Sequence, residues 1–168
     1  RRVAPRVELE ALCNEIAVRW RCERAALGLC RGLHVELRAL SHTDHFRRNT
    51  KLVLALEAAM EECVDQDVEI AVPPVPGTGG IERAHRELAA GRSSVASLPL
   101  RHDGEPGAVL LVERTVDRPL ASDEIQALRR RIEVGFTSAV SSSKRTRADI
   151  LDAYVDRITA DVKLARPL

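Results

Sequence analysis

The sequence contains few aromatic residues and no long hydrophobic run. Aromatic residues make up 2% of its 168 residues, and they stand singly at Trp20, Phe46, Phe136 and Tyr154. Without basic residues between them, they offer no stacking platform for single-stranded nucleic acid. Apolar clusters end at a charged residue well before the ~18 residues that a membrane span needs, so this chain is not expected to cross a membrane.

The sequence also lacks a strong charge of either sign and lacks paired cysteines. Its 26 Lys and Arg residues nearly balance its 25 Asp and Glu residues, so no whole-chain field favours nucleic acid or anionic lipid. The four cysteines form no CxxC motif and have no histidine at metal-binding spacing, which argues against a zinc site and favours a reducing, cytoplasmic setting. We therefore expect buried thiols at Cys13, Cys22, Cys30 and Cys63.

Length and composition predict one globular domain. With 168 residues, 45% of them hydrophobic, the chain can form a soluble domain with a core and a helical extension. It begins with Arg1 and has no signal peptide, so we interpret it as part of a longer protein.

The hydrophobic pattern of the first third predicts a helix followed by a hairpin. Apolar residues recur every three or four positions over residues 7–21. They then alternate with other residues over 25–30 and 35–39, on either side of Arg31-Gly32. These two runs predict a β-hairpin whose second strand has one polar face.

A second helix is expected over residues 47–66. Its buried face is predicted from apolar residues three and four positions apart: Leu52, Leu56, Ala59, Met60 and Cys63. Three glutamates, Glu57, Glu61 and Glu62, are expected to point away from that face. A short strand over 69–72 then leads into a loop rich in proline and glycine over 73–80, and a short helix is expected over 81–90.

Residues 93–116 predict a second hairpin, and a long helix follows it. Two apolar runs flank the charged turn Asp103-Gly104, and Ser122 is placed to cap a helix whose first turn is acidic. The apolar stripe of that helix fades at the serines of 141–143. Beyond it, residues 146–168 carry an apolar spacing that suits either a short coiled coil or a helix folded back on the domain.

These elements, in this order, resemble a GAF domain over residues 7–142, with 143–168 as a C-terminal helical extension or linker. The resemblance implies an α+β fold: a GAF/PAS-like, profilin-like antiparallel β-sheet flanked by helices. The segments CERAALGLCRGLHVELRALSHTDHF, LALEAAMEECVDQ, VPPVP and SLPLRHDGEPGAVLLVER resemble the GAF modules fused to bacterial haemolysin-secretion-type (HlyD-like) membrane-fusion adaptor subunits. That arrangement implies a module at the cytoplasmic face of the inner membrane, ahead of a membrane anchor that this chain does not contain.

The resemblance further implies a ligand pocket between one face of the sheet and the connecting helix and loops. Eight residues are expected to line it: His42, Phe46, Met60, Val72, Pro74, Ile81, His85 and Ser97. The expected ligand is a small molecule of unknown identity, and no cofactor is assigned. His42, Asp44 and His45 could together hold a metal ion, but a solvated turn is the simpler interpretation, so no metal site is predicted.

Three functions are compatible with this pattern. The first is a non-catalytic GAF sensor or regulatory module that binds a small molecule, forms a homodimer and signals through its terminal helices. The second is a GAF scaffold that dimerises without any ligand. The third is a cysteine-dependent enzyme similar to free methionine sulfoxide reductases, which would require a solvent-accessible cysteine of low pKa. No cysteine stands where that family places its catalytic thiols, so no catalytic residue is assigned.

Overall fold

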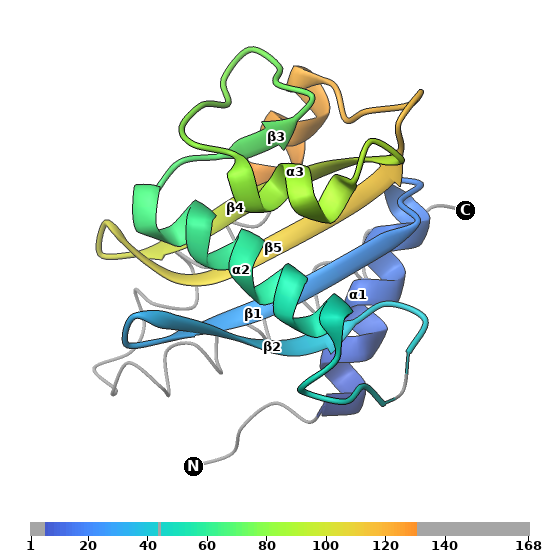
Figure 1. The fold of residues 1–168 in the computed structure, drawn as a ribbon, viewed down its shortest axis with the longest axis vertical. Helices are drawn as coiled ribbons and strands as arrows, with labels where there is room; N and C mark the ends of the chain where they lie inside the picture. Colours follow the sequence, from blue (N-terminus) through green and yellow to red (C-terminus); the bar gives the residue numbers. More distant parts are fainter. Residues whose placement is uncertain (1–5, 44, 131–168) are drawn as a thin grey trace.

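The structure is a computed structural model that describes residues 6–43 and 45–130. Its elements, shown in Figure 1, are α1 (Arg6–Arg19), β1 (Arg24–Arg31), β2 (His34–Leu40), α2 (Lys51–Gln66), β3 (Ile70–Val72), α3 (Arg83–Ala89), β4 (Ser93–His102) and β5 (Glu105–Thr115). Residues 122–130 are the described part of a further helix. The predicted α+β fold class is confirmed.

Within the described residues, five strands form one open antiparallel sheet in the order β2-β1-β5-β4-β3. β1 and β2 form the first hairpin, and β4 and β5 form the second. The predicted turn between β4 and β5 has positive φ angles at both Asp103 (53°) and Gly104 (81°). Two consecutive left-handed residues match the twist of the flanking strands, which explains why an Asp-Gly pair joins them.

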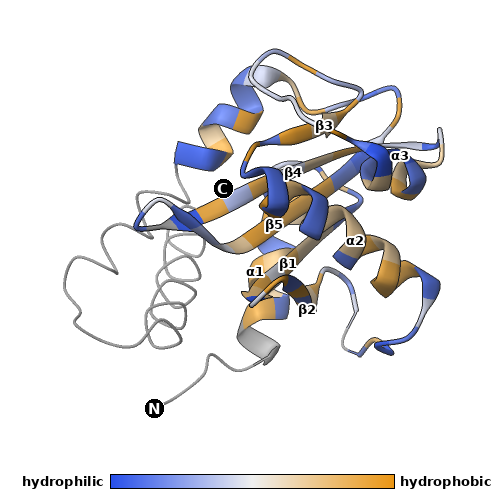
Figure 2. Ribbon diagram, turned by 60° about the vertical axis from the view of Figure 1, so that its left-hand side comes forward, coloured by the Kyte–Doolittle hydropathy of each residue, from blue (hydrophilic) through white to orange (hydrophobic). Residues whose placement is uncertain are grey.

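Helices cover both faces of the sheet. α2 and α3 lie in front of it and α1 lies behind it in Figure 1. Side chains of a strand alternate between the two faces, so Leu110 packs with α1 and with Leu128, while Leu111 packs with α2. Hydrophobic residues accordingly run along the middle strands in Figure 2, whereas the helices contain both hydrophobic and hydrophilic residues.

Two features of α2 differ from the prediction. α2 begins at Lys51 rather than at residue 47, because Thr50 caps it: the backbone of Thr50 is extended and its hydroxyl accepts the Val53 N–H at 3.3 Å. The second difference concerns Glu57, Glu61 and Glu62, which were predicted to point away from the buried face of α2 and instead make hydrogen bonds. They accept backbone N–H groups of neighbouring elements, from Val35 and Leu37 in β2 and from Ala84 in α3. Helical periodicity locates the apolar face, but it carries no information on the donors beside that face.

The helix that follows β5 begins at residue 122, but Ser122, the predicted cap, is its first helical residue, and the Ser122 hydroxyl donates to the Pro76 C=O at 2.6 Å. Glu124 Oε1 accepts the Ala121 N–H at 3.0 Å, and both of its oxygens are bound by Arg114 of β5. Ile125 and Leu128 of the predicted stripe are buried. The rest of that stripe, the domain boundary at residue 142 and the extension over 143–168 lie outside the described residues. No helix in the described part of the chain is long and apolar enough to cross a bilayer.

Candidate functional site

A buried hydrogen-bonded cluster connects α2, α3 and β4. His85 Nδ1 lies 2.7 Å from Glu62 Oε1, and His85 Nε2 lies 2.7 Å from Ser97 Oγ. The His85 side chain is fully buried, and Ser97 is 1% exposed. These three residues are called the Glu62–His85–Ser97 cluster below.

Secondary structure places each member of the cluster. Ser97 lies in β4, paired with Ile70 of β3 and Leu111 of β5, and those partners belong to the apolar layer under α2. His85 lies near the start of α3. Glu62 holds that start, because its carboxylate accepts the backbone N–H of Ala84 at 2.8 Å and of His85 at 3.2 Å. Glu62 thereby provides the cap that α3 lacks locally, since the side chain of its N-cap residue makes no capping bond.

Burial keeps His85 uncharged. Desolvation lowers the pKa of His85 below its ordinary value, and the nearby carboxylates of Glu62 and Glu82 offset this only in part. Burial alone would raise the pKa of Glu62, but hydrogen bonds from the Ala84 N–H, the His85 ring and the His85 N–H together lower it. At neutral pH, a Glu62 carboxylate therefore accepts the Nδ1 proton of a neutral imidazole, which leaves Nε2 to accept the Ser97 hydroxyl proton.

The order of the three groups is that of a nucleophilic triad, but the surroundings do not suit nucleophilic chemistry. Ser97 is 1% exposed, so in this arrangement its hydroxyl is closed off from solvent. β4 is paired with a strand on each side, so its backbone N–H groups are held in the sheet and cannot form an oxyanion hole. The geometry instead suits a satisfied polar network that orients α3 on the sheet.

The structure brings some of the eight predicted pocket residues together. His85 and Ser97 are hydrogen-bonded to each other. Met60 belongs to the buried apolar layer under α2, and Phe46 and Val72 pack against that layer. These five residues therefore lie on or beside the face of the sheet that α2 and α3 cover.

The other three predicted residues lie at the surface. His42 and Pro74 are exposed, and Ile81 is 68% exposed. The His42 N–H donates to Asn14 Oδ1 of α1, the helix on the opposite face of the sheet from His85. His42 and His85 therefore do not converge, and a ligand-binding role for the eight residues stays a prediction.

The architecture is shared with solved structures. It matches a domain of a putative two-component sensor histidine kinase from Sinorhizobium meliloti 1021, with a TM-score of 0.54 and 16% identity over 98% of this chain and 99% of that one. It also matches the GAF domain/HD domain protein from Geobacter sulfurreducens, with a TM-score of 0.51 and 9% identity over 95% and 94% of the two chains. The chain has the fold of a GAF domain.

Residues 122 to 287 of a methyl-accepting chemotaxis protein overlap this GAF fold with a TM-score of 0.51 and 14% identity, over 90% of this chain and 88% of that one. No protein-family model and no curated protein matches the sequence. At such low identities, the structural likeness establishes the fold and does not transfer a ligand or an activity.

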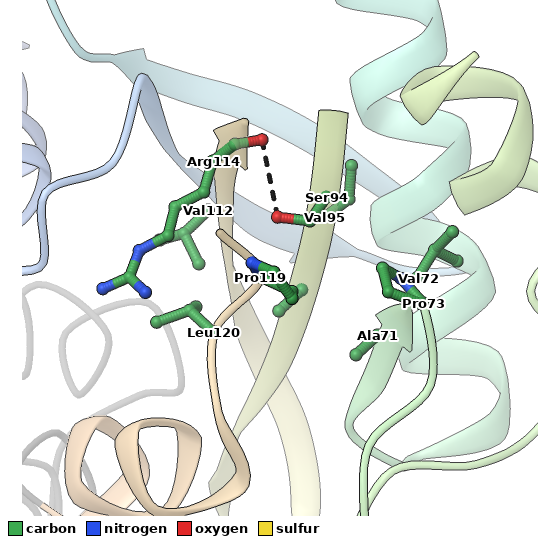
Figure 3. A pocket seen from close by; sticks show the side chains of 10 residues that line it. Ala71, Val72, Pro73, Ser94, Val95, Val112, Arg114, Pro119 and Leu120 are labelled. Carbon is green, nitrogen blue, oxygen red and sulfur yellow. Dashed lines mark hydrogen bonds between the residues drawn. The ribbon is translucent and has the colours of Figure 1, made fainter. Parts of the chain in front are cut away.

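The space under α2 is filled in this GAF fold. Five large side chains there are fully buried against one another: Leu37, Leu56, Met60, Ile70 and Leu111. A small pocket opens elsewhere, beside Ala71, Ala96 and Val112, which pack on the α1 side of the sheet. Figure 3 shows it between Pro119 and Leu120 on one side and β3 on the other. About 10 Å³ is open there to the centre of a water molecule, which is room for roughly one water.

Three cysteines of the GAF fold have unreactive thiols. Burial raises the pKa of Cys13 to about 12 and that of Cys22 to about 11, and it raises the pKa of Cys63 further. A nucleophilic cysteine needs the opposite, a lowered pKa and access to solvent. Cys30 is half-buried in β1.

The described residues contain no group of three His, Cys, Asp or Glu side chains that could hold a metal ion. Two of the three ligands considered above, His42 and His45, are exposed, and Asp44 lies outside the described residues.

The loop between β3 and α3 connects the cluster side of the GAF fold to the helix at 122–130. Gln66, at the end of α2, binds both the N–H of Ile81 at 2.6 Å and its C=O at 2.8 Å. At the other side of the loop, the Ser122 hydroxyl donates to the Pro76 C=O at 2.6 Å. The loop is therefore hydrogen-bonded to α2 at Ile81 and to the helix at 122–130 at Pro76.

A buried carboxylate forms a second connection to this helix. Glu69, just before β3, is 7% exposed and accepts a hydrogen bond from Arg129 at 2.6 Å. Arg101 of β4 lies 3.3 Å from its other oxygen and also binds Asp67 at the end of α2. Neither connection could be predicted from the sequence, because the hydrogen-bonded residues are between 32 and 60 positions apart in the chain.

Proposed function

We propose that this chain is a non-catalytic regulatory GAF module in which a change at the Glu62–His85–Ser97 cluster is passed to the helix at 122–130. The observation that carries the proposal is the pair of connections from the β3 side of the sheet to that helix, Ser122 to Pro76 and Arg129 to Glu69. The segment that contains Pro76 is also fixed to α2 through Gln66, and α2 contributes Glu62 to the cluster.

The route is short enough to act as a mechanical link. A displacement of α3 would move Ile81, because Ile81 lies just before α3. The N–H and the C=O of Ile81 are both hydrogen-bonded to Gln66 of α2. The loop then either stretches the Ser122–Pro76 hydrogen bond or moves the helix with it. A ligand uses this link only if it binds one of the two arrangements more tightly than the other.

The cluster fits a small molecule with an apolar body and one hydrogen-bonding group. His85 and Ser97 provide a ring nitrogen and a hydroxyl that can exchange donor and acceptor roles. Met60, Ile70 and Leu111 provide apolar walls next to them. Because these side chains now fill the space, the ligand would enter by displacing α3, a helix of seven residues, together with the exposed loop before it.

A ligand-free GAF scaffold that dimerises through its terminal helices is the second candidate. The filled layer under α2 favours it, because a scaffold needs a rigid core and no cavity. The cysteine-dependent reductase is disfavoured by the raised pKa values of the three buried thiols.

Native mass spectrometry of the purified chain separates the two candidates. The sensor proposal predicts an added small mass, absent after denaturation, on a dimer or a monomer. A dimer of the bare sequence mass, unchanged after incubation with a small-molecule extract of the producing cells, would instead support the scaffold.

The resemblance to GAF modules of HlyD-like adaptors supports a cytoplasmic setting in which the helix at 122–130 leads towards a membrane anchor. The coding sequence beyond residue 168 tests this setting. We expect a hydrophobic span followed by an adaptor domain, and a different downstream domain would contradict the setting without affecting the proposed regulatory role.

A further inference from the structure

We infer that α2 guards the open edge of the β-sheet and so prevents a second copy of the chain from adding a strand there. β2 is an edge strand of seven residues, and an edge strand presents backbone N–H groups that no strand satisfies. Two of these groups are occupied by α2. The Val35 N–H donates to Glu61 Oε2 at 3.0 Å, and the Leu37 N–H donates to Glu57 Oε2 at 2.9 Å.

The spacing of the carboxylates matches the spacing of the donors. Glu57 and Glu61 are four residues apart on a helix, a rise of about 6 Å. Val35 and Leu37 are two residues apart on a strand, a rise of about 6.6–6.8 Å. The helix runs antiparallel to the strand, since the earlier glutamate binds the later residue of β2. The two carboxylates therefore replace consecutive carbonyl groups of an absent sixth strand.

Neighbouring side chains hold the two carboxylates in place. Arg48 lies 3.5 Å from Glu57 and 3.7 Å from Glu36 of β2, and His34 lies 3.5 Å from Glu61. A strand that approached β2 would have to displace these side chains and leave two carboxylates without their backbone donors. Such a loss costs more than a new strand–strand hydrogen bond returns, because hydrogen bonds to charged groups are the stronger kind.

The opposite edge strand in the described part of the chain, β3, is short. β3 has three residues, and the loop that follows it folds back so that the Gly79 N–H donates to the Glu69 C=O at 3.0 Å. With β2 guarded and β3 only three residues long, we expect a homodimer to use the helices rather than a continuous sheet. This inference does not depend on the proposed signalling role, because it rests on β2 and α2 alone.

The variant E57A/E61A, compared with E57Q/E61Q, tests the inference. Alanine removes both acceptors, whereas glutamine keeps an oxygen at each position, so the glutamine variant is the matched control. In sedimentation velocity, we expect E57A/E61A to form concentration-dependent oligomers larger than the wild-type species, and E57Q/E61Q to match the wild type. An E57A/E61A variant that keeps the wild-type oligomeric state would overturn the inference.

Amide hydrogen exchange of the single variants adds a readout at individual residues and covers the case in which the double variant fails to fold. Under conditions where each is not associated, E61A should accelerate exchange of the Val35 amide by roughly tenfold or more and leave Leu37 unchanged, and E57A should do the reverse. Unchanged exchange at both amides would mean that the carboxylates do not protect the edge and would equally overturn the inference.

Discussion

Replacement of Glu62 with alanine is expected to lower the free energy of unfolding by about 2–4 kcal/mol, a large effect for one side chain. The carboxylate satisfies three donors at once: the Ala84 N–H, the His85 N–H and the His85 ring. Its removal leaves the first turn of α3 without a cap and a fully buried imidazole without its Nδ1 partner. Chemical denaturation at neutral pH measures the change.

Two further variants show whether this loss belongs to the cluster. Glu62→Gln retains an acceptor for the backbone N–H groups and should lose less than half as much stability. Glu87→Ala removes an exposed glutamate of α3 whose partner, Arg83, lies 3.6 Å away, so it should change stability by no more than about 0.5 kcal/mol. If E62A and E87A cost the same, Glu62 does not organise α3.

Acid is expected to destabilise the protein in two steps, the first of which belongs to His85. Well above pH 6.5 the His85 ring is neutral in both the folded and the unfolded chain, so His85 adds no pH dependence to the free energy of unfolding there. Below 6.5 the unfolded chain binds a proton at His85 before the folded protein does, because burial lowers the folded pKa. The free energy of unfolding therefore falls as the pH drops from 6.5 to the lowered pKa of the folded state.

Glu62 adds the second step in the same direction. Its folded pKa lies below its ordinary value of 4.5, so the stability it contributes is present above 4.5 and is lost as the pH falls through the folded pKa. Denaturant unfolding at a series of pH values measures both steps. The variant H85Q should lack the upper step, whereas H34Q, which changes a histidine 83% exposed, should retain it. An unchanged upper step in H85Q would contradict the assignment.

The fold could be predicted from the sequence because its signals are local. Alternating runs defined β1 and β2, and the Asp103-Gly104 pair defined the turn before β5. The acidic residues that follow Ser122 marked the start of the last helix, although Ser122 itself does not cap it. Each of these patterns spans a few residues and has one low-energy backbone solution. The start of α2 was misplaced by four residues because the capping role of Thr50 was not recognised.

The candidate site was only partly predictable, for a physical reason. His85 and Ser97 were expected near each other from the order of elements, and they are hydrogen-bonded. Glu62 was expected to point away, because it lies next to the apolar face of α2 rather than on it. Its hydrogen-bond donors come from α3, more than 20 residues later in the chain, so helical periodicity did not reveal them. Gln66, Glu69 and Arg129 were missed for the same reason, since single-sequence periodicity does not report contacts between distant segments.

The proposed regulatory function requires that the Glu62–His85–Ser97 cluster and the helix at 122–130 are connected. The filled layer around Met60 does not contradict this claim, because a link of hydrogen bonds transmits a displacement whether or not a cavity exists beforehand. A sensor and a scaffold differ in this link. A sensor requires that a change at the cluster displaces the helix at 122–130, whereas a scaffold does not.

Amide hydrogen exchange in the variant S97A tests that connection most directly. Loss of the Ser97 hydroxyl removes the Nε2 partner of His85 and should loosen α3, and the account predicts several-fold faster exchange over residues 76–81 and 123–130. Ser41→Ala is the matched control: Ser41 is 4% exposed and its hydroxyl accepts the Ala25 N–H, which is not part of this hydrogen-bonded link, so exchange over 123–130 should stay at the wild-type rate. Faster exchange confined to α3 in S97A, or an equal response in both variants, would contradict the account.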